Sequence, residues 1–162
     1  VLYITNEALL KTAKEKIPEL AVKIPILTAM ISKGIHLHYT EIQFDCDWSD
    51  RTKDNYFLLL NELRKWQRAP IQFSATIRLH QVKYYKRTGI PPVDRGMLMF
   101  YNMGKVGDLR TVNSIYNKTD AEKYTSSIRN YPLACDAALP IFKWVVLFQR
   151  GKIAGLFNAL SA

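Results

Sequence analysis

The chain has 162 residues, and a chain of this length buries about 70% of the surface that its unfolded form exposes, so one domain with a real core is expected. Hydrophobic residues make up 48% and charged residues 23%, which excludes a disordered or fibrous protein. No run of about 18 apolar residues is present, and no membrane span is predicted.

The net charge of +9 allows a polyanion as partner, but the basic residues are scattered. The densest cluster, in residues 83–87, holds three basic side chains, and we interpret it as a solvated surface. No basic stripe interleaved with aromatic residues is visible, so nucleic acid is an unlikely partner.

The first residues, VLYITNEALL, lack the features of a signal peptide and an initiator Met. We therefore expect the chain to begin inside a larger gene product. The sequence assigns no localisation, and a secreted or periplasmic location is one alternative. Cys46 and Cys135 lie in apolar, strand-like runs, which favours buried thiols over a disulfide.

The elements alternate between strands and helices along the chain. A short strand at residues 2–4 leads into a helix that Pro18 ends, and a second helix covers residues 20–32. Strands are expected at residues 35–48, 71–80 and 97–102, with one or two more at 131–144. Helices are expected after residue 50, where Ser49 or Asp50 can act as the cap, and at residues 120–128.

Two of the expected strands have one polar and one apolar face, because alternate residues of a strand point to opposite sides. The polar faces carry Glu41, Gln43, Asp45 and Asp47 in one strand, and Ser74, Thr76, Arg78 and His80 in the other. A sheet covered by helices on both sides would show apolar residues on both faces. Helices outside and a polar interior predict an α/β fold, a (β/α) barrel of the TIM type; the alternative is an antiparallel sheet with one solvated face.

Asp45 and Asp47 are the candidate catalytic residues. They share the polar face near the carboxyl end of their strand, where barrel active sites form. Two close carboxylates separate each other's titration, so one can act as an acid while the other stays charged, as glycoside hydrolysis requires. The alternative, equally open from periodicity, is that they bind a structural arginine such as Arg78.

The string FDCDWS, residues 44–49, resembles the chitinase-type signature of glycoside hydrolase family 18, commonly DGIDIDWE. Asp45, Asp47 and Trp48 match its second and third Asp and its Trp, whereas Ile42 replaces the first Asp and Ser49 replaces the proton-donating Glu. Weaker likeness follows in the family's order, at residues 74–80 for the fifth strand, 93–102 for the sixth and 133–142 for the seventh. The resemblance implies a partial barrel, about strands three to seven, in one domain over residues 1–162.

In the family the Asp that matches Asp47 steadies an intermediate formed by the substrate's acetamido group. A hydroxyl at Ser49 is far too weak an acid to replace the Glu, so ordinary chitinase chemistry is not expected. Ser49→Glu is expected to restore weak cleavage. The residues predicted to bind substrate are Trp48, Arg78, His80, Tyr101, Asn102, Asp136 and Trp144.

Two functions remain open at this stage. The first is a glycoside-hydrolase-like barrel that acts on or binds a glycan or another small polar ligand. The second is a non-catalytic glycan-binding or scaffold domain. The chain has no glycine-rich phosphate loop, so no cofactor is predicted. His36 and His38 are expected at the opposite end of their strand, so no metal ligands are assigned. Oligomeric state is not predicted.

Overall fold

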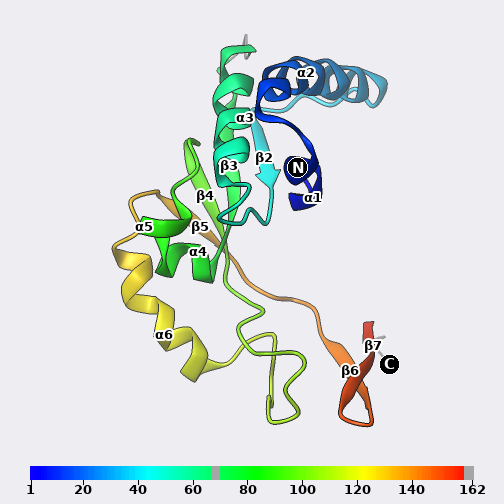
Figure 1. Ribbon diagram of the computed structural model, residues 1–162, viewed down its shortest axis with the longest axis vertical. Coiled ribbons are helices and arrows are strands. Elements are labelled where there is room, and N and C mark those ends of the chain that lie inside the picture. The colour runs from blue at the N-terminus through cyan, green and yellow to red at the C-terminus, as the bar shows by residue number, and fades with distance from the viewer. Residues whose placement is uncertain (67–69, 159–162) are drawn as a thin grey trace.

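The computed structural model describes residues 1–66 and 70–158, and its centre is a parallel sheet of five strands (Figure 1). The strand order in the sheet equals the order in the chain. The strands are β1 (Leu2–Tyr3), β2 (Glu41–Asp45), β3 (Gln72–Arg78), β4 (Arg95–Met99) and β5 (Cys135–Ala138). The chain is thus α/β, with a sheet consistent with part of an α/β barrel.

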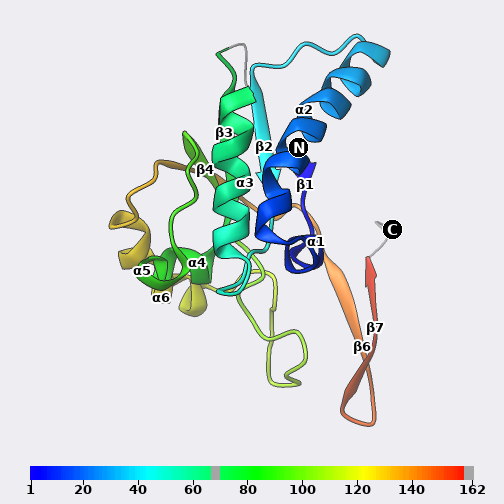
Figure 2. The ribbon, with the colours of Figure 1, turned by 45° about the horizontal axis from the view of Figure 1, so that its top comes forward.

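The long helices cover one face of this sheet. In Figure 2, α2 (Ile17–Gly34) and α3 (Lys53–Trp66) lie in front of β2 and β3. The shorter helices lie near the carboxyl ends of the strands: α1 (Asn6–Lys11), α4 (Leu79–Lys83), α5 (Tyr85–Thr88) and α6 (Lys118–Arg129). A 3-10 turn, Lys14–Lys16, precedes α2. Among the described residues, no helix is long and apolar enough to cross a membrane.

The core lies between the sheet and α3, as the alternating pattern predicts. Phe73, Ala75 and Ile77 of β3 are buried against the helices. The apolar stripe of α3 faces them and is also buried; it consists of Tyr56, Leu59, Leu60 and Leu63. Trp66, the last residue of the helix, is 50% exposed.

Gly96 of β4 lies close to side chains of both neighbouring strands. A Cβ atom added there would lie 2.5 Å from Sγ of Cys135 on β5 and 3.0 Å from Cγ1 of Ile77 on β3. Both distances are shorter than carbon–sulfur or carbon–carbon contact, so a side chain at position 96 would force the strands to shift. Cys46 and Cys135 are free thiols; Cys46 is buried, as the sequence predicts, whereas Cys135 is only half-buried.

The strands are shorter than their patterns predict. The strand expected at residues 35–48 is regular only at Glu41–Asp45, and the one expected at residues 71–80 ends at Arg78, so His80 lies in a helix. The strand expected at 97–102 is displaced to Arg95–Met99. The prediction that Pro18 ends a helix is wrong: Pro18 lies in the first turn of α2, where a missing N–H costs nothing.

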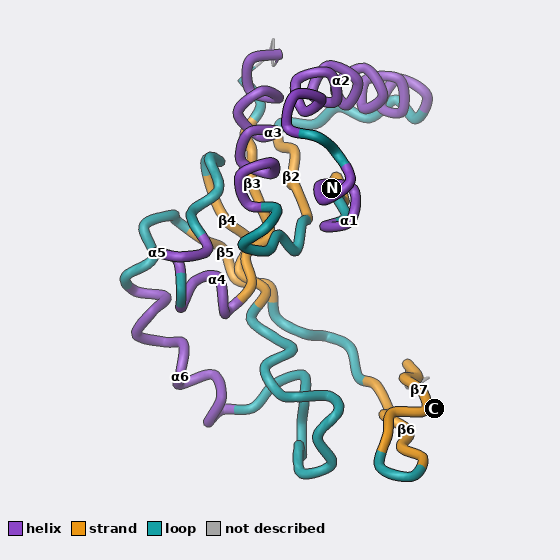
Figure 3. The backbone as a smooth tube through the Cα atoms, in the orientation of Figure 1, coloured by secondary structure: helices purple, strands orange, loops and turns teal. Residues whose placement is uncertain are grey.

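A hairpin that the sequence analysis missed follows the sheet. β6 (Trp144–Gln149) and β7 (Lys152–Asn158) pair antiparallel around Arg150 and Gly151, which both have positive φ. Figure 1 shows the hairpin apart from the main sheet. Figure 3 shows the long loop after β4 descending toward the same end of the molecule.

Strand β1 lies at one edge of the sheet, next to an apolar groove of about 430 Å³. The groove is bounded by β1 and by α2, whose Leu27 and Ile31 are more than half exposed. At the other edge, β5 pairs with β4 alone among residues 1–66 and 70–158. The five strands therefore form an open sheet with two free edges.

Candidate functional site

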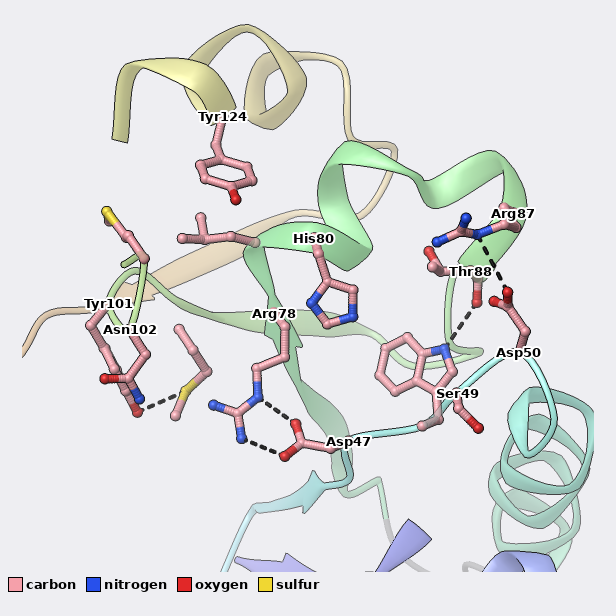
Figure 4. A pocket seen from close by; sticks show the side chains of 14 residues that line it. Asp47, Ser49, Asp50, Arg78, His80, Arg87, Thr88, Tyr101, Asn102 and Tyr124 are labelled. Atoms are coloured by element: carbon pink, nitrogen blue, oxygen red, sulfur yellow. Dashed lines mark hydrogen bonds and ion pairs between the residues drawn. The ribbon is translucent and has the colours of Figure 1, made fainter. Parts of the chain in front are cut away.

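A pocket of about 690 Å³ lies at the carboxyl ends of β2, β3 and β4 (Figure 4). Parallel strands end at the same edge of a sheet, so the loops that follow them meet there. β2 is followed by Asp47 and Ser49, β3 ends at Arg78, and β4 is followed by Tyr101 and Asn102. The structure therefore contains a pocket at the edge of the sheet where the sequence predicts one.

Arg78 and Asp47 form an ion pair in this pocket (Figure 4). Nη2 of Arg78 donates to Oδ2 of Asp47 at 3.0 Å, and Nε donates to Oδ1. Burial disfavours the charged guanidinium, but the hydrogen bond and the negative charge of Asp47 outweigh it and raise the pKa of Arg78. The sequence left open whether Asp47 is a catalytic carboxylate or binds a structural arginine, and the structure shows the contact with Arg78.

Asp45 lies on the same face of the sheet but has a different partner. Thr76 of β3 donates to Oδ1 of Asp45 at 2.7 Å, and Ser74 binds Glu41 one step earlier along the strands. Asp45 does not line the pocket. The two candidate catalytic carboxylates therefore have different surroundings. Asp45 is bound by Thr76 on the polar face of the sheet, and Asp47 faces the pocket beside Arg78.

Trp48 borders the pocket from below but is only 3% exposed. Its ring stacks on Tyr56 of α3 at 5.2 Å, and its Nε1 donates to the carbonyl of Thr88 at 2.9 Å. The stack and the hydrogen bond fix the indole ring between α3 and α5. Trp48 therefore supports the pocket from the core and has almost no surface to offer a ligand.

Ser49 lines the pocket. Its Oγ lies 3.2 Å from Oγ1 of Thr52, and its backbone N donates to the same Thr52 oxygen at 2.9 Å. Thr52 in turn donates to Asn6 of α1. Ser49 thus belongs to a polar network that joins the loop before α3 to the N-terminal helix.

His80, Tyr101 and Asn102 all line the pocket. Burial lowers the pKa of His80; the charge of Asp47 acts in the opposite direction. The hydroxyl of Tyr101 donates to Sδ of Met99 at 3.4 Å, and its ring packs edge-on against Phe142 at 5.6 Å. These side chains offer one aromatic face and several hydrogen-bonding groups to a ligand.

Asp136 and Trp144 lie outside the pocket. Asp136 forms an ion pair with Arg95 of β4, and Nε1 of Trp144 donates to Oγ of Ser114 at 3.1 Å in the loop beside the hairpin. The structure therefore does not bring these two predicted substrate-binding residues to Asp47 and Arg78.

The sequence analysis missed several residues around the pocket. Arg87 of α5 and Tyr124 of α6 line its upper side, and the buried Gln81 accepts from the backbone N of Arg78 at 2.7 Å. Arg87 belongs to the basic cluster that was interpreted as solvated surface, whereas no sequence signal distinguishes Tyr124 or Gln81. Within residues 1–66 and 70–158, no three His, Cys, Asp or Glu side chains are grouped to hold a metal ion.

No family model matches the chain, and no curated protein matches it. Among solved structures, the fold is similar to the crystal structure of the Bacillus cereus spore cortex-lytic enzyme SleL, with a TM-score of 0.61 and 15% sequence identity. The match covers 98% of this chain and 40% of SleL, so the chain spans less than half of that protein. At this identity the likeness concerns the fold alone: the chain has the α/β architecture of part of that enzyme.

Proposed function

We propose that this chain is a carbohydrate-binding module of glycoside-hydrolase-like fold, diverged from chitinase-type enzymes, with its ligand in the pocket of Asp47, Arg78 and Tyr101. The observation that carries the proposal is the position of these polar and aromatic groups at the carboxyl ends of consecutive parallel strands. The similarity of fold to a spore cortex-lytic enzyme agrees with it.

Binding without cleavage is the function that the geometry favours. Glycoside hydrolysis needs a proton donor and a second, available carboxylate. Position 49 offers a hydroxyl that is part of the Thr52 network, and the Asp47 carboxylate is held by Arg78. Hydrolysis is the second candidate, supported by the second and third Asp of the family signature.

The test is a titration with chitotetraose followed by calorimetry, using wild type, Asp47→Asn and Tyr101→Ala. We expect measurable affinity in the wild type and about a tenfold loss in each variant, because Asp47→Asn replaces a charged acceptor oxygen by an amide and Tyr101→Ala removes a stacking face at the ligand. Asp108→Asn is the matched control, because Asp108 also binds an arginine, Arg110, through two bonds but does not line this pocket.

Equal binding by wild type and both pocket variants would contradict the proposed site. Release of reducing ends that Asp47→Asn abolishes, with the variant still folded, would show that the chain is a hydrolase and not only a binding module.

We also propose that the open sheet is part of a closed barrel that further β/α units complete. The free edge of β1 and the apolar groove beside α2 support this, since unpaired strand edges and exposed apolar grooves favour association. A closed barrel would also enclose the polar face of β2 and β3.

A further inference from the structure

A group of basic and aromatic side chains lies beside the pocket, on α4, α5 and α6. We call it the basic rim; its members are Lys83, Tyr84, Lys86, Arg87 and Tyr124. Nζ of Lys83 lies 5.7 Å from the ring centre of Tyr84 and 5.4 Å from that of Tyr124. The guanidinium of Arg87 lies 5.3 Å from the ring centre of Tyr84. The rings thus hold the two cations at a defined spacing.

The basic rim is continuous with the pocket. Tyr124 and Arg87 line the pocket itself, and Figure 4 shows the Tyr124 side chain pointing down into it. A shallow depression of about 280 Å³ on the outer side is bounded by residues 83–87 and shares Arg87 with the pocket. A ligand longer than one sugar that leaves the pocket on this side therefore runs past Lys83 and Lys86.

The charges inside the pocket are balanced, whereas those of the rim are not. Arg78 binds Asp47, and Arg87 lies 3.4 Å from Asp50. Lys83 and Lys86 are exposed, and neither forms an ion pair with any residue in the described ranges. The sequence between Glu62 and Asp94 contains no Asp or Glu, so no nearby position of this segment compensates them.

The free cations beside the pocket are suited to a carboxylate as the bound anion. Arginine presents a fork of donors suited to phosphate, but the guanidinium groups of Arg78 and Arg87 already face carboxylates. The cations that remain are lysines, which act as point charges and need no particular oxygen geometry. Single carboxylates spaced along a chain fit such a pair.

Building on the proposed glycan binding, we infer that the ligand is a carboxylate-bearing glycan: a neutral sugar occupies the pocket, and a carboxylate of an adjoining unit is held by Lys83 and Lys86. The charge-balanced pocket accepts the neutral unit, and the basic rim supplies the attraction for the acidic one.

The experiment compares two tetrasaccharides of equal length, chitotetraose and a hyaluronan tetrasaccharide, in which glucuronate alternates with N-acetylglucosamine. Affinities are measured by calorimetry for wild type and for the double variant Lys83→Gln/Lys86→Gln. The control is Lys14→Gln/Lys33→Gln, which removes the same charge from two exposed lysines at the ends of the N-terminal helical region.

We expect wild type to bind the hyaluronan tetrasaccharide about three- to tenfold more tightly than chitotetraose at low salt, as two exposed charge contacts allow. The preference should disappear in Lys83→Gln/Lys86→Gln, persist in the control, and shrink when salt rises from about 0.02 to about 0.2 M. Affinity for chitotetraose should stay the same in all three proteins.

Each other result decides against the inference. Equal affinity for both sugars, or an equal loss of the preference in the control variant, would contradict carboxylate binding by the basic rim. Glycan binding in the pocket would still stand. Tighter binding of a tetranucleotide than of either sugar would assign the rim to nucleic acid. Binding of neither sugar would instead remove the proposed function itself.

Discussion

Arg78, at the end of β3, and Asp47, in the loop after β2, face each other, with Nη2 donating to Oδ2 at 3.0 Å and Nε donating to Oδ1. The Arg78 side chain is 27% exposed and that of Asp47 58% exposed, so water screens the pair from the pocket side. The pair therefore contributes little to stability. Its main effect is to fix the orientation of both groups at the pocket.

This pair changes what a restored acid can do. A Glu at position 49 would need the negative charge of Asp47 beside it to raise its pKa toward neutral pH, and Arg78 cancels that charge. We therefore expect Ser49→Glu alone to show at most weak cleavage of chitotetraose. Ser49→Glu combined with Arg78→Met should cleave faster, because Asp47 is then free. Reducing-end release measures both, and equal rates in the two proteins would contradict the argument.

His80 should make the stability of the protein depend on pH. Burial lowers its pKa in the folded state below the ordinary value of 6.5, with Arg78 and Arg87 acting in the same direction and Asp47 and Asp50 against it. Below pH 6.5 the unfolded chain binds the proton more readily, so stability falls as the pH falls from there toward the folded-state pKa and is full above 6.5. Urea unfolding of wild type and His80→Gln at several pH values measures this effect. We expect a flatter profile in the variant, and parallel profiles would contradict the prediction.

Trp48→Phe should destabilise the fold by about 2 kcal/mol. It removes the hydrogen bond to the Thr88 carbonyl, leaves that buried oxygen without its partner, and reduces the stacked area on Tyr56. Denaturant unfolding gives the size of the loss. Because Trp48 is 3% exposed, the folded variant should keep most of its glycan affinity. A large loss of affinity without loss of stability would show instead that Trp48 contacts the ligand.

Gly96→Ala should cost about 1–3 kcal/mol, because the new methyl group would overlap Sγ of Cys135. Cys135→Ala removes that sulfur. The double variant Gly96→Ala/Cys135→Ala should therefore be more stable than the sum of the two single changes predicts, which a double-mutant cycle measures. Additive effects would place the strain elsewhere, for example at Ile77.

The groove beside β1 should make the isolated chain associate with itself. Leu27 and Ile31 expose apolar surface next to a free strand edge. Sedimentation velocity at rising concentration is expected to show larger species in wild type and fewer of them in Leu27→Glu. Lys23→Glu, on the same helix but outside the groove, is the control, and an equal effect of both changes would exclude the groove.

The sequence predicted the alternation of strands and helices and the buried face of β3, because both depend on local periodicity. It could not show where a strand stops. His80 was placed on a strand, but Gln81 accepts from the backbone of Arg78 and the chain turns into α4 there. The partner of Asp136 was missed because Arg95 precedes the expected strand.

The hairpin could have been found. Two runs rich in apolar and aromatic residues flank Arg150 and Gly151, and a two-residue connection with glycine is a known hairpin signal. Other features depend on tertiary contacts that no periodicity encodes. Tyr124 reaches the pocket only because α6 packs beside α4, although the two helices are separated along the chain by a strand and a long loop.

The strands lie in the sheet in the same order as in the chain, which suits folding during synthesis. Each strand pairs with the strand that precedes it in the chain, so every new pairing during synthesis finds its template already present. No strand has to wait for a segment that is made after it, and the longest connections to be closed run from Tyr3 to Glu41 and from Met99 to Cys135. The sheet can therefore grow from β1 toward β5 as the ribosome releases the chain, with α3 covering β2 and β3 before the pocket residues of β4 emerge.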